Sequence, residues 1–349
     1  MRVLITGASG FLGRYVVAEA VRRGHEVTAL VRPSRNLPDG LFPAGVKTAR
    51  ADVRNRDALM NAVEGVDAVV HLAACVVGDD DTQFASTVVG TENLLAAMVE
   101  KKINRLIHCS TFSVYDWRTS GDTLDEQSPL EPDLYARDGY AISKTWQERL
   151  VRRAADSNDW HLAVLRPGFI WGAGNELIAG IGQSVGPMHL VIGGSRPLPL
   201  TYVENCADCF LNALESDAPA GETFNVIDTD TVSAWRYMGQ CLDAGVAKGF
   251  RFYLPNWVGI SAATVASWTS RLLFGPTGKL PGLFVPIKFR ARFRPLQFPN
   301  QKARKQLHWH SKYTVRAAWD RIRLGEGELL SVGPTTDESS QPRAEKSLV

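Results

Sequence analysis

The sequence predicts an α/β fold in which a doubly wound parallel sheet is followed by a smaller C-terminal portion. Over the first two-thirds of the chain, short β-branched runs alternate with longer helical patterns, as in sheets covered by helices on both faces. The β-branched runs are almost continuously apolar, which is typical of strands buried on both sides. The chain also opens on a strand, a glycine-rich turn and a helix start within residues 1–13.

These patterns predict the elements of the sheet in order. Strands are expected at residues 3–5, 26–31, 46–51, 67–71, 105–108 and 162–165, with a late strand at 224–226 that rejoins the sheet. Helices are expected at 11–23, 85–101 and 139–155, and another from about residue 205. Residues 252–307 are rich in Trp, Phe, Leu and Pro but show no clear period.

The composition is that of an ordinary globular enzyme. Of 349 residues, 45% are apolar and 22% are charged, which allows a substantial core. Lys and Arg number 39 against 37 Asp and Glu, and this net charge of +2 gives no reason to expect a nucleic-acid partner. Cys206 and Cys209 have redox or zinc spacing, but no second Cys or His pair accompanies them, so no metal site is expected. Scattered cysteines, and a strand where a signal peptide would stand, favour a reducing cytoplasm.

Three glycines follow the first predicted strand at intervals of three: Gly7, Gly10 and Gly13. Gly7 permits the tight turn out of the strand, Gly10 lets backbone amides approach a phosphate, and Gly13 allows close packing of helix on strand. The helix that begins there offers amide donors and a positive dipole to an anion. The motif therefore predicts a site for a dinucleotide pyrophosphate; a glycine turn without a ligand is the alternative.

The end of the second predicted strand bears on which dinucleotide binds. Such sites usually have an acid there that binds the adenosine ribose, but this chain has Arg32, followed by Arg35. Because a guanidinium can pair bidentately with a 2′-phosphate, we expect NADP, with NAD and a solvated Arg32 as the alternative. Asp52, after the third strand, is placed either to accept a hydrogen bond from the adenine amino group or to cap the next helix.

Tyr140 and Lys144 lie four residues apart on a predicted helix, so their side chains share one face. A free tyrosine is a poor base at neutral pH, but a neighbouring ammonium and a positive nicotinamide ring favour the phenolate. We expect Tyr140 to exchange a proton with the substrate oxygen during hydride transfer, and Lys144 also to bind the nicotinamide ribose. Tyr135 has Gly139, not a cation, four residues on. An exposed Tyr–Lys pair without chemistry is the alternative.

These motifs belong to a longer pattern. The matching segments are residues 6–13, 52–53, 71–74, 90–95, 110–115, 140–144, 166–168, 202–205, 224–226, 302–303 and 307–309. Over about residues 1–309 the chain resembles the extended short-chain dehydrogenase/reductases of the NAD-dependent epimerase/dehydratase type, which have a Rossmann fold. Thr87 departs from the family pattern, which usually has Asn at that position.

The resemblance implies further site residues. Beside those already named, it implies cofactor contacts for Phe11, Leu12, Val53, Leu72, Ala73 and Ala74, and a nicotinamide-amide contact for Pro167 and Gly168. Counting back three residues from Val114, as in the family pattern, selects Thr111 as the hydroxyl that polarises a substrate carbonyl. Ser110 and Ser113 remain alternatives. Relatives often pair through two helices per subunit, so a homodimer is one expectation, although the sequence itself leaves the oligomeric state open.

The chain is expected to divide into three parts. Residues 1–170, with 200–230 returning to them, form the NAD(P)-binding Rossmann domain. Residues 171–330 form mainly the substrate-binding portion. Residues 331–349 turn to Ser, Thr, Pro, Glu and Lys and are expected to be a disordered tail.

The substrate is less well determined. Relatives that act on nucleotide sugars often have a phosphate-binding Asn near the position of Gly168 and Phe169, and this chain has none there. Its pattern is more similar to 3β-hydroxysteroid dehydrogenase-like and dihydroflavonol reductase-like members. We therefore expect hydride transfer at an alcohol or ketone carbon of a bulky, sterol-like or isoprenoid molecule. The alternatives are a nucleotide-sugar epimerase or dehydratase using the same Tyr and Lys, and a regulator that senses NADP without turnover.

Residues 252–294 raise the expectation of peripheral contact with a membrane. Residues 252–270 are uncharged, though too polar to predict a membrane span, and plain core packing is the alternative. Residues 288–294 alternate cations with apolar residues, so as a strand they would place four cations on one face. That face could bind a diphosphate or anionic headgroups, or it could be a charged edge strand.

Overall fold

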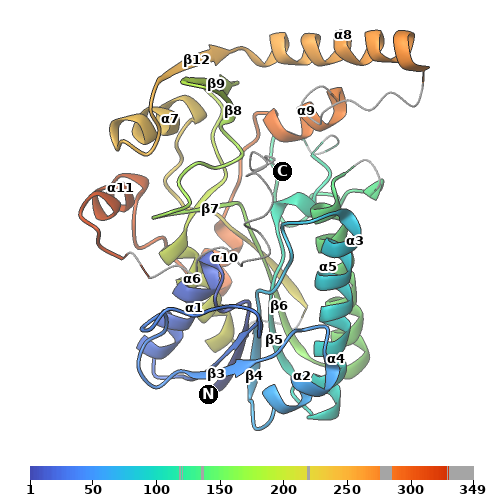
Figure 1. The fold of residues 1–349 in the computed structure, drawn as a ribbon, viewed down its shortest axis with the longest axis vertical. Coiled ribbons are helices and arrows are strands. Elements are labelled where there is room, and N and C mark those ends of the chain that lie inside the picture. The colour runs from blue at the N-terminus through green and yellow to red at the C-terminus, as the bar shows by residue number, and fades with distance from the viewer. Residues whose placement is uncertain are drawn as a thin grey trace.

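A seven-stranded parallel sheet forms the centre of the molecule (Figure 1). The computed structural model describes residues 1–117, 119, 121–134, 137–217, 221–275, 285–327 and 329. Tyr135 and the predicted tail at 331–349 lie outside these residues. The strands follow the order β11-β6-β5-β4-β1-β2-β3. Their bounds are β1 Arg2–Thr6, β2 Glu26–Val31, β3 Lys47–Arg50, β4 Ala68–His71, β5 Arg105–Cys109, β6 His161–Pro167 and β11 Glu222–Val226.

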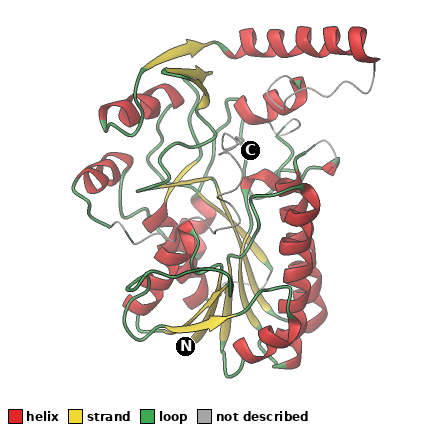
Figure 2. Cartoon of the chain, in the orientation of Figure 1, coloured by secondary structure: helices red, strands yellow, loops and turns green. Residues whose placement is uncertain are grey.

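Helices cover both faces of this sheet (Figures 1 and 2). One face carries α1 (Phe11–Arg22) and α6 (Val203–Glu215), and the other carries α2 (Arg56–Ala62), α4 (Gly90–Glu100) and α5 (Gly139–Asn158). Successive strand residues enter opposite cores, because side chains alternate along a strand. Val3 and Ile5 lie in the core with α1 and α6, whereas Leu4 lies in the core with α2, α4 and α5.

The predicted fold class is confirmed, and the predicted sheet elements are found with small shifts at their ends. The late strand rejoins the sheet as expected, since β11 pairs in parallel with β6 and sets Phe224 beside Leu165. The predicted helix at 85–101 is longer than expected. It begins with α3 (Asp80–Phe84), continues through a π-helical turn at Ala85–Val89 and runs directly into α4.

The C-terminal portion contains elements that the sequence patterns did not predict. β7 (Phe169–Trp171) pairs with β10 (Leu200–Tyr202), and β9 (Met188–Ile192) lies between β8 (Gly182–Val185) and β12 (Phe250–Leu254). The helices are α7 (Ala234–Asp243), α8 (Asn256–Phe274), α9 (Pro286–Phe293), α10 (Gln301–Gln306) and α11 (Val315–Arg323). The division of the chain at residue 170 remains a proposal, and the return of β11 to the sheet is in keeping with it.

The prediction of a cationic strand at residues 288–294 is wrong, because this segment is helix α9. Pro286 stands at the start of the helix, where its fixed φ angle and missing N–H are tolerated. Phe289 and Phe293, four residues apart, are buried and pack against each other with ring centroids 4.9 Å apart. Residues four apart lie on one side of a helix, so the helical form places both rings in the same core. Cations two residues apart point to different sides of a helix, so the expected cationic face does not form.

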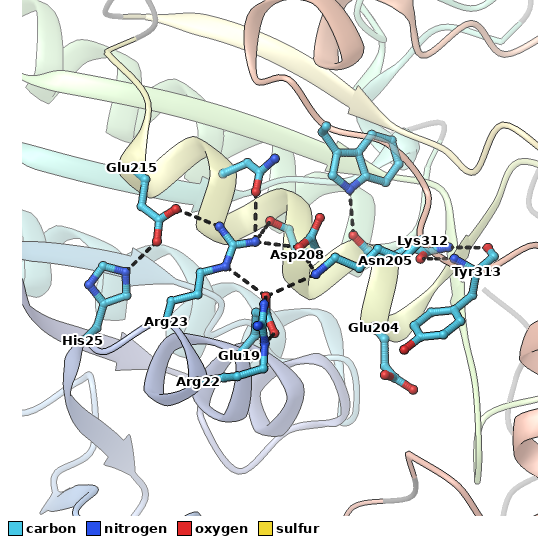
Figure 3. A network of polar contacts seen from close by, with 12 residues as sticks. Glu19, Arg22, Arg23, His25, Glu204, Asn205, Asp208, Glu215, Lys312 and Tyr313 are labelled. Atoms are coloured by element: carbon cyan, nitrogen blue, oxygen red, sulfur yellow. Dashed lines mark hydrogen bonds and ion pairs between the residues drawn. The ribbon is translucent and has the colours of Figure 1, made fainter.

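A polar network joins α1, α6 and the C-terminal segment (Figure 3). Arg23, at the end of α1, donates to Glu19, Asp208 and Glu215 at distances of 2.5–2.9 Å. Lys312 forms ion pairs with Glu19 and Asp208. These contacts hold the segment around Lys312 against α1 and α6.

Candidate active site

The carboxyl ends of β1 and β4 form the edge at which the site is built. These two strands are neighbours, but the chain leaves them toward opposite sides of the sheet, which is where ligands bind in doubly wound folds. Thr6, at the end of β1, joins them: its Oγ1 accepts hydrogen bonds from the amides of Leu72 (3.2 Å) and Ala73 (3.1 Å). Leu72, Ala73 and Ala74 are partly exposed at this edge. Thr6 was not among the predicted site residues.

The glycine turn leaves a cradle for a phosphate. Gly7 has φ +67°, and a Cβ atom there would lie 2.9 Å from the amide nitrogen of Ala73. A Cβ atom on Gly13 would lie 2.1 Å from the carbonyl oxygen of Gly7, so α1 can approach β1 only without a side chain. Gly10 is exposed and caps α1 without a side-chain hydrogen bond, so the first amides of α1 are offered to a ligand. This cradle fits the pyrophosphate of a nicotinamide dinucleotide. Phe11 is partly exposed and Leu12 is buried at its border.

The loop after β2 begins with a cation. Arg32 is exposed, and Arg50 donates to the carbonyl oxygens of Arg35 (3.1 Å) and Pro33 (3.4 Å), which fixes the shape of this loop. The loop therefore presents a guanidinium and no carboxylate at its first position.

Asp52 is held by Arg54 and does not cap the next helix. The Arg54 guanidinium donates to both carboxylate oxygens, at 3.0 and 2.7 Å, and these hydrogen bonds lower the pKa of Asp52. The cap of α2 is Asn55, whose Oδ1 accepts from the Ala58 amide at 3.1 Å, so the capping alternative is wrong. Val53 packs closely against Gly90, where a Cβ atom would lie 2.5 Å from the Val53 Cγ2.

Tyr140 lies in the first turn of α5 and contacts the loop after β5. The residue as a whole is partly exposed, and the nearby Thr111 side chain acts to lower the pKa of the Tyr140 phenol. Ser110 faces another way, because its hydroxyl donates to Glu148 over 2.5 Å. Ser113 lies 3.4 Å from the Thr111 hydroxyl and remains within reach of the site. The structure thus brings Thr111 and Tyr140 together and engages Ser110 elsewhere.

Lys144 is buried beneath Tyr140 and is held by two oxygen acceptors. Its ammonium donates to the carbonyl oxygen of Cys109 at 2.5 Å and to Oε1 of Gln147. Burial lowers the pKa of Lys144 to about 8. Burial also raises the pKa of Tyr140, although the nearby Thr111 side chain opposes that shift. The expected drop in the pKa of Tyr140 is therefore absent here, because burial dominates and Lys144 donates to other groups.

A buried polar network behind Lys144 was missed by the sequence reasoning. His71 contacts Thr6 through Nδ1 (2.7 Å) and Thr91 through Nε2 (2.9 Å). Burial lowers the pKa of His71 to about 3, so the imidazole is neutral. The Gln147 amide donates to Thr91 at 2.8 Å, and its oxygen receives Lys144. The only available clue was a His at the end of an apolar strand and a Gln three residues after Lys144.

The end of β6 supplies the remaining predicted residues. Pro167 is buried and Gly168 is partly exposed. A Cβ atom on Gly168 would lie 2.1 Å from the carbonyl oxygen of Pro199, so only glycine fits this crossing. Just before it, Arg166 forms a buried ion pair with Glu148, which steadies α5 against β6. Thr87 is the position at which the chain departs from the family pattern. Its hydroxyl accepts a hydrogen bond from the Cys75 amide at 2.9 Å and so holds the loop after β4.

Cys206 and Cys209 lie inside the apolar core on α6. Both thiols are free and buried, and burial raises both pKa values well above the ordinary value. Packing with the surrounding core is the role that these contacts support.

Comparison with known proteins shows which family the chain belongs to. The model of the NAD dependent epimerase/dehydratase family matches residues 3–226. The chain is 29% identical over 340 residues to a 4-hydroxy-2-methyl-3-oxo-4-farnesyl-3,4-dihydroquinoline-1-oxide ketoreductase of Stigmatella aurantiaca, covering 94% of this chain and 99% of the relative. It is 34% identical over 256 residues to a 2-alkyl-3-oxoalkanoate reductase of Stenotrophomonas maltophilia, covering 70% of this chain and 76% of the relative. A 3 beta-hydroxysteroid dehydrogenase/Delta 5-->4-isomerase of Mycobacterium tuberculosis is 28% identical over 334 residues, with 91% and 88% covered.

Solved structures share the fold. The crystal structure of gox2253 superposes with a TM-score of 0.75 at 24% identity, covering 93% of this chain and 98% of that chain. The UDP-glucose 4-epimerase of Thermus thermophilus in complex with NAD gives 0.67 at 21% identity, with 93% and 99% covered. At these identities the likeness shows the fold alone. By its family match and its named relatives, the chain belongs to the NAD dependent epimerase/dehydratase family and is an oxidoreductase of the extended short-chain dehydrogenase/reductase type.

Proposed function

We propose that this oxidoreductase uses NADP to transfer hydride at an alcohol or ketone carbon of a bulky apolar molecule, sterol-like or isoprenoid, with Tyr140 as the acid/base. The observation that carries the proposal is the approach of the Thr111 side chain to the Tyr140 phenol, with Lys144 buried one helical turn from Tyr140 on α5. Two hydroxyl groups thereby converge at the carboxyl edge of the sheet, beside the glycine cradle. Such a pair can grip one substrate oxygen and exchange a proton with it.

The protein groups have separable tasks in this proposal. A bound nicotinamide supplies or accepts the hydride. The raised pKa of Tyr140 keeps the phenol protonated at neutral pH, so it can donate a proton to a carbonyl oxygen that is being reduced. The Thr111 hydroxyl is the second donor and orients that oxygen. Lys144 has three N–H donors, and the described contacts use two of them, which leaves one for the nicotinamide ribose.

The proposed cofactor site follows the carboxyl edge of the sheet. Its residues are Gly7, Gly10, Phe11, Leu12, Gly13, Arg32, Asp52, Val53, Leu72, Ala73, Ala74, Tyr140, Lys144, Pro167 and Gly168. The preference for NADP is supported by the exposed Arg32 on a loop that Arg50 holds in shape. A guanidinium there can bind the 2′-phosphate that NAD lacks.

The proposed substrate class is supported by the relatives. The named substrates of three of them are a farnesyl dihydroquinoline oxide, a 2-alkyl-3-oxoalkanoate and a 3β-hydroxysteroid, all of which combine a polar oxygen with a large apolar body. Epimerase or dehydratase chemistry is separated from this proposal by cofactor balance. An epimerase returns its hydride, whereas an oxidoreductase consumes or releases one reduced cofactor per turnover.

Three further parts of the proposal concern the setting of the enzyme. We place it in the cytoplasm, and the five free thiols are in keeping with a reducing compartment. We propose a homodimer, on the analogy of the family. We also propose that residues 252–294 contact a membrane surface. Among the described residues, no helix combines the length and apolar character needed to cross a bilayer.

The experiment that tests the proposed chemistry compares Tyr140→Phe with the wild type in NADPH oxidation assays on steroid ketones and long-chain 2-alkyl-3-oxo acids. We expect net NADPH consumption by the wild type and a fall in kcat of about 10²- to 10⁴-fold for the variant, since only the proton donor is lost. The dissociation constant of NADP should be unchanged. Tyr313→Phe, on the C-terminal segment, is the matched control and should keep full activity. Full activity of Tyr140→Phe would remove Tyr140 from the chemistry.

A further inference from the structure

Helix α8 presents an unusual apolar face to solvent. In Figure 1 it is the long helix that extends beyond the rest of the molecule, at the end opposite the sheet. The exposed fractions of Trp257, Trp268 and Leu272 are 71%, 66% and 71%. With Val265 (60%), these residues recur at intervals of eight, three and four, so they share one side of the helix.

The other side of α8 is packed on the protein. Ala263 is 1% exposed and belongs to a small core with Phe289 and Phe293 of α9, against which Ile260 also packs. A Cβ atom on Gly259 would lie 2.1 Å from the ring of Phe289, so the two helices are in close contact there. The exposed stripe is therefore held in a fixed direction, away from the folded body.

Strand β12 continues this apolar surface. It leads directly into α8 and exposes Phe250 (56%) and Phe252 (53%) on one face, with Tyr253 (44%) on the opposite face toward α7. Single exposed apolar residues are common, but the four exposed apolar residues along one side of α8, with Phe250 and Phe252 just before it, mark an interaction site. Tryptophan and tyrosine are the side chains that favour the boundary between lipid and water, because their rings are apolar and their N–H or O–H groups are polar.

The charge of this part of the chain is one-sided. No Asp or Glu occurs between Asp243 and Asp320, whereas the same stretch holds thirteen Lys and Arg residues. Since the whole chain has a net charge of +2, the remainder is net acidic. Lys302 and Lys312 pair with acids of the sheet domain. Arg271, in the last turn of α8, is exposed at the end of the apolar stripe, and Arg290 of the adjoining helix α9 is also exposed.

We infer that α8 and β12 form a docking surface for an anionic lipid bilayer, with α8 lying in the interface. Apolar rings beside exposed cations match the acyl boundary and the negatively charged headgroups. A second copy of the chain fits less well, because a two-fold contact would place this segment, with its excess of cations and no Asp or Glu of its own, against itself. This docking names the surface and the lipid for the membrane contact proposed above, and it is independent of the proposed chemistry. That the docked enzyme takes its apolar substrate from the bilayer rests on the proposed function.

The test is cosedimentation of the full chain with vesicles of phosphatidylglycerol and phosphatidylcholine in equal parts, and with vesicles of phosphatidylcholine alone. We expect binding to the anionic vesicles that weakens steeply with salt, since its charge-dependent part is screened. The double variants W257S/W268S and R271E/R290E should each lose binding at least tenfold. Trp146→Ser is the matched control, because Trp146 is 42% exposed on α5, outside this surface, and it should bind as the wild type does.

The outcomes separate docking from its alternatives. Unchanged NADP affinity and circular dichroism would show that each variant is folded. Wild-type protein that stays in the supernatant, or equal losses for Trp146→Ser and W257S/W268S, would overturn the inference. So would light scattering that shows a lipid-free dimer which W257S/W268S converts to monomer, because the face would then be a subunit contact. Vesicle binding needs no substrate, so it can hold even if Tyr140→Phe proves fully active.

Discussion

The ammonium of Lys144 lies 2.5 Å from the carbonyl oxygen of Cys109, which ties helix α5 to the end of strand β5. The same ammonium donates to Gln147, which is itself bound to Thr91 behind the site. Lys144 is therefore a buried cation with neutral acceptors, set one helical turn from Tyr140. Because burial lowers the pKa of Lys144 to about 8, the stability of the fold should depend on the protonation of a residue in the proposed active site.

The buried Lys144 should make stability rise at alkaline pH. Its pKa is about 8 in the fold and near the ordinary value of 10.5 when unfolded, so the unfolded chain binds more protons between these values. The free energy of unfolding should therefore rise between pH 8 and 10.5, by up to about 1.4 kcal/mol per pH unit. Below pH 8 the buried ammonium is charged, and its full desolvation cost lowers the free energy of unfolding. Urea unfolding of the wild type and of Lys144→Met at pH 7.5, 9 and 10 checks this. Identical pH profiles would contradict it.

Thr111 should contribute to turnover more than its neighbours do. Thr111→Val keeps the shape but removes the hydroxyl that contacts Tyr140, and kcat should fall by about 10²- to 10³-fold, as for loss of a donor to a developing oxyanion. Ser113→Ala, in the same loop, is the control and should change kcat little. Steady-state kinetics with the substrate found in the NADPH screen measure both. The reverse order of effects would assign the role to Ser113.

Arg32 should determine the preference for NADP. Arg32→Asp should weaken NADP about 10- to 100-fold, the effect of one charge-assisted contact, and should leave NAD binding equal or improved. Arg56→Asp is the matched control, because Arg56 carries the same charge on the neighbouring helix α2 but faces Glu100. Isothermal titration of both cofactors tests this. An equal loss of NADP affinity in the two variants would indicate only a general charge effect.

Gly13 should tolerate no side chain. Gly13→Ala would place a Cβ atom 2.1 Å from the carbonyl oxygen of Gly7 and 2.8 Å from the backbone of Ala8, so α1 must shift away from β1. We expect destabilisation by about 2 kcal/mol or more and loss of NADP binding. Gly121→Ala is the control, since a Cβ atom there meets nothing within 4 Å. Urea unfolding and cofactor titration measure the two effects, and equal behaviour of the variants would rule out the tight crossing.

Glu19, in the network of Figure 3, should make the fold sensitive to acid. Burial alone would raise its pKa, but hydrogen bonds from Arg22 and Arg23 outweigh burial and lower the pKa to about 2. The resulting stabilisation, of the order of 3 kcal/mol, is present above the unfolded pKa of about 4.5 and is lost as the pH falls toward 2. Urea unfolding at pH 7 and 3.5 should show a smaller acid loss for Glu19→Gln than for the wild type. Glu64→Gln, an exposed acid, should behave as the wild type.

The sheet domain could be predicted because its determinants are local. The apolar runs at 26–31 and 105–108, and the glycines at 7, 10 and 13, carry the strand, turn and packing requirements within a few residues. The spacing of Tyr140 and Lys144 likewise fixes a shared helical face before any tertiary contact is known. These segments depend on the rest of the chain only to bury their apolar side chains.

The remaining features depend on contacts between distant segments. The partners of Lys144 come from β5 and from Gln147, and the burial that raises the pKa of Tyr140 comes from several elements, so spacing alone could not show this burial. In the C-terminal portion, α9 is helical because Phe289 and Phe293 fill one small core, although its cations alternate as in a strand. The helical period of apolar residues in α8 could not be recognised from the sequence, because both faces of that helix carry apolar residues.

The position of the Tyr140 phenol in a crystal structure with bound NADP is the most direct test of the proposed site. We predict that Tyr140 Oη lies beside C4 of the nicotinamide, with the Thr111 hydroxyl next to it and the pyrophosphate against Gly10. A phenol turned away from the nicotinamide, or a dinucleotide bound away from the glycine turn, would contradict the assignment.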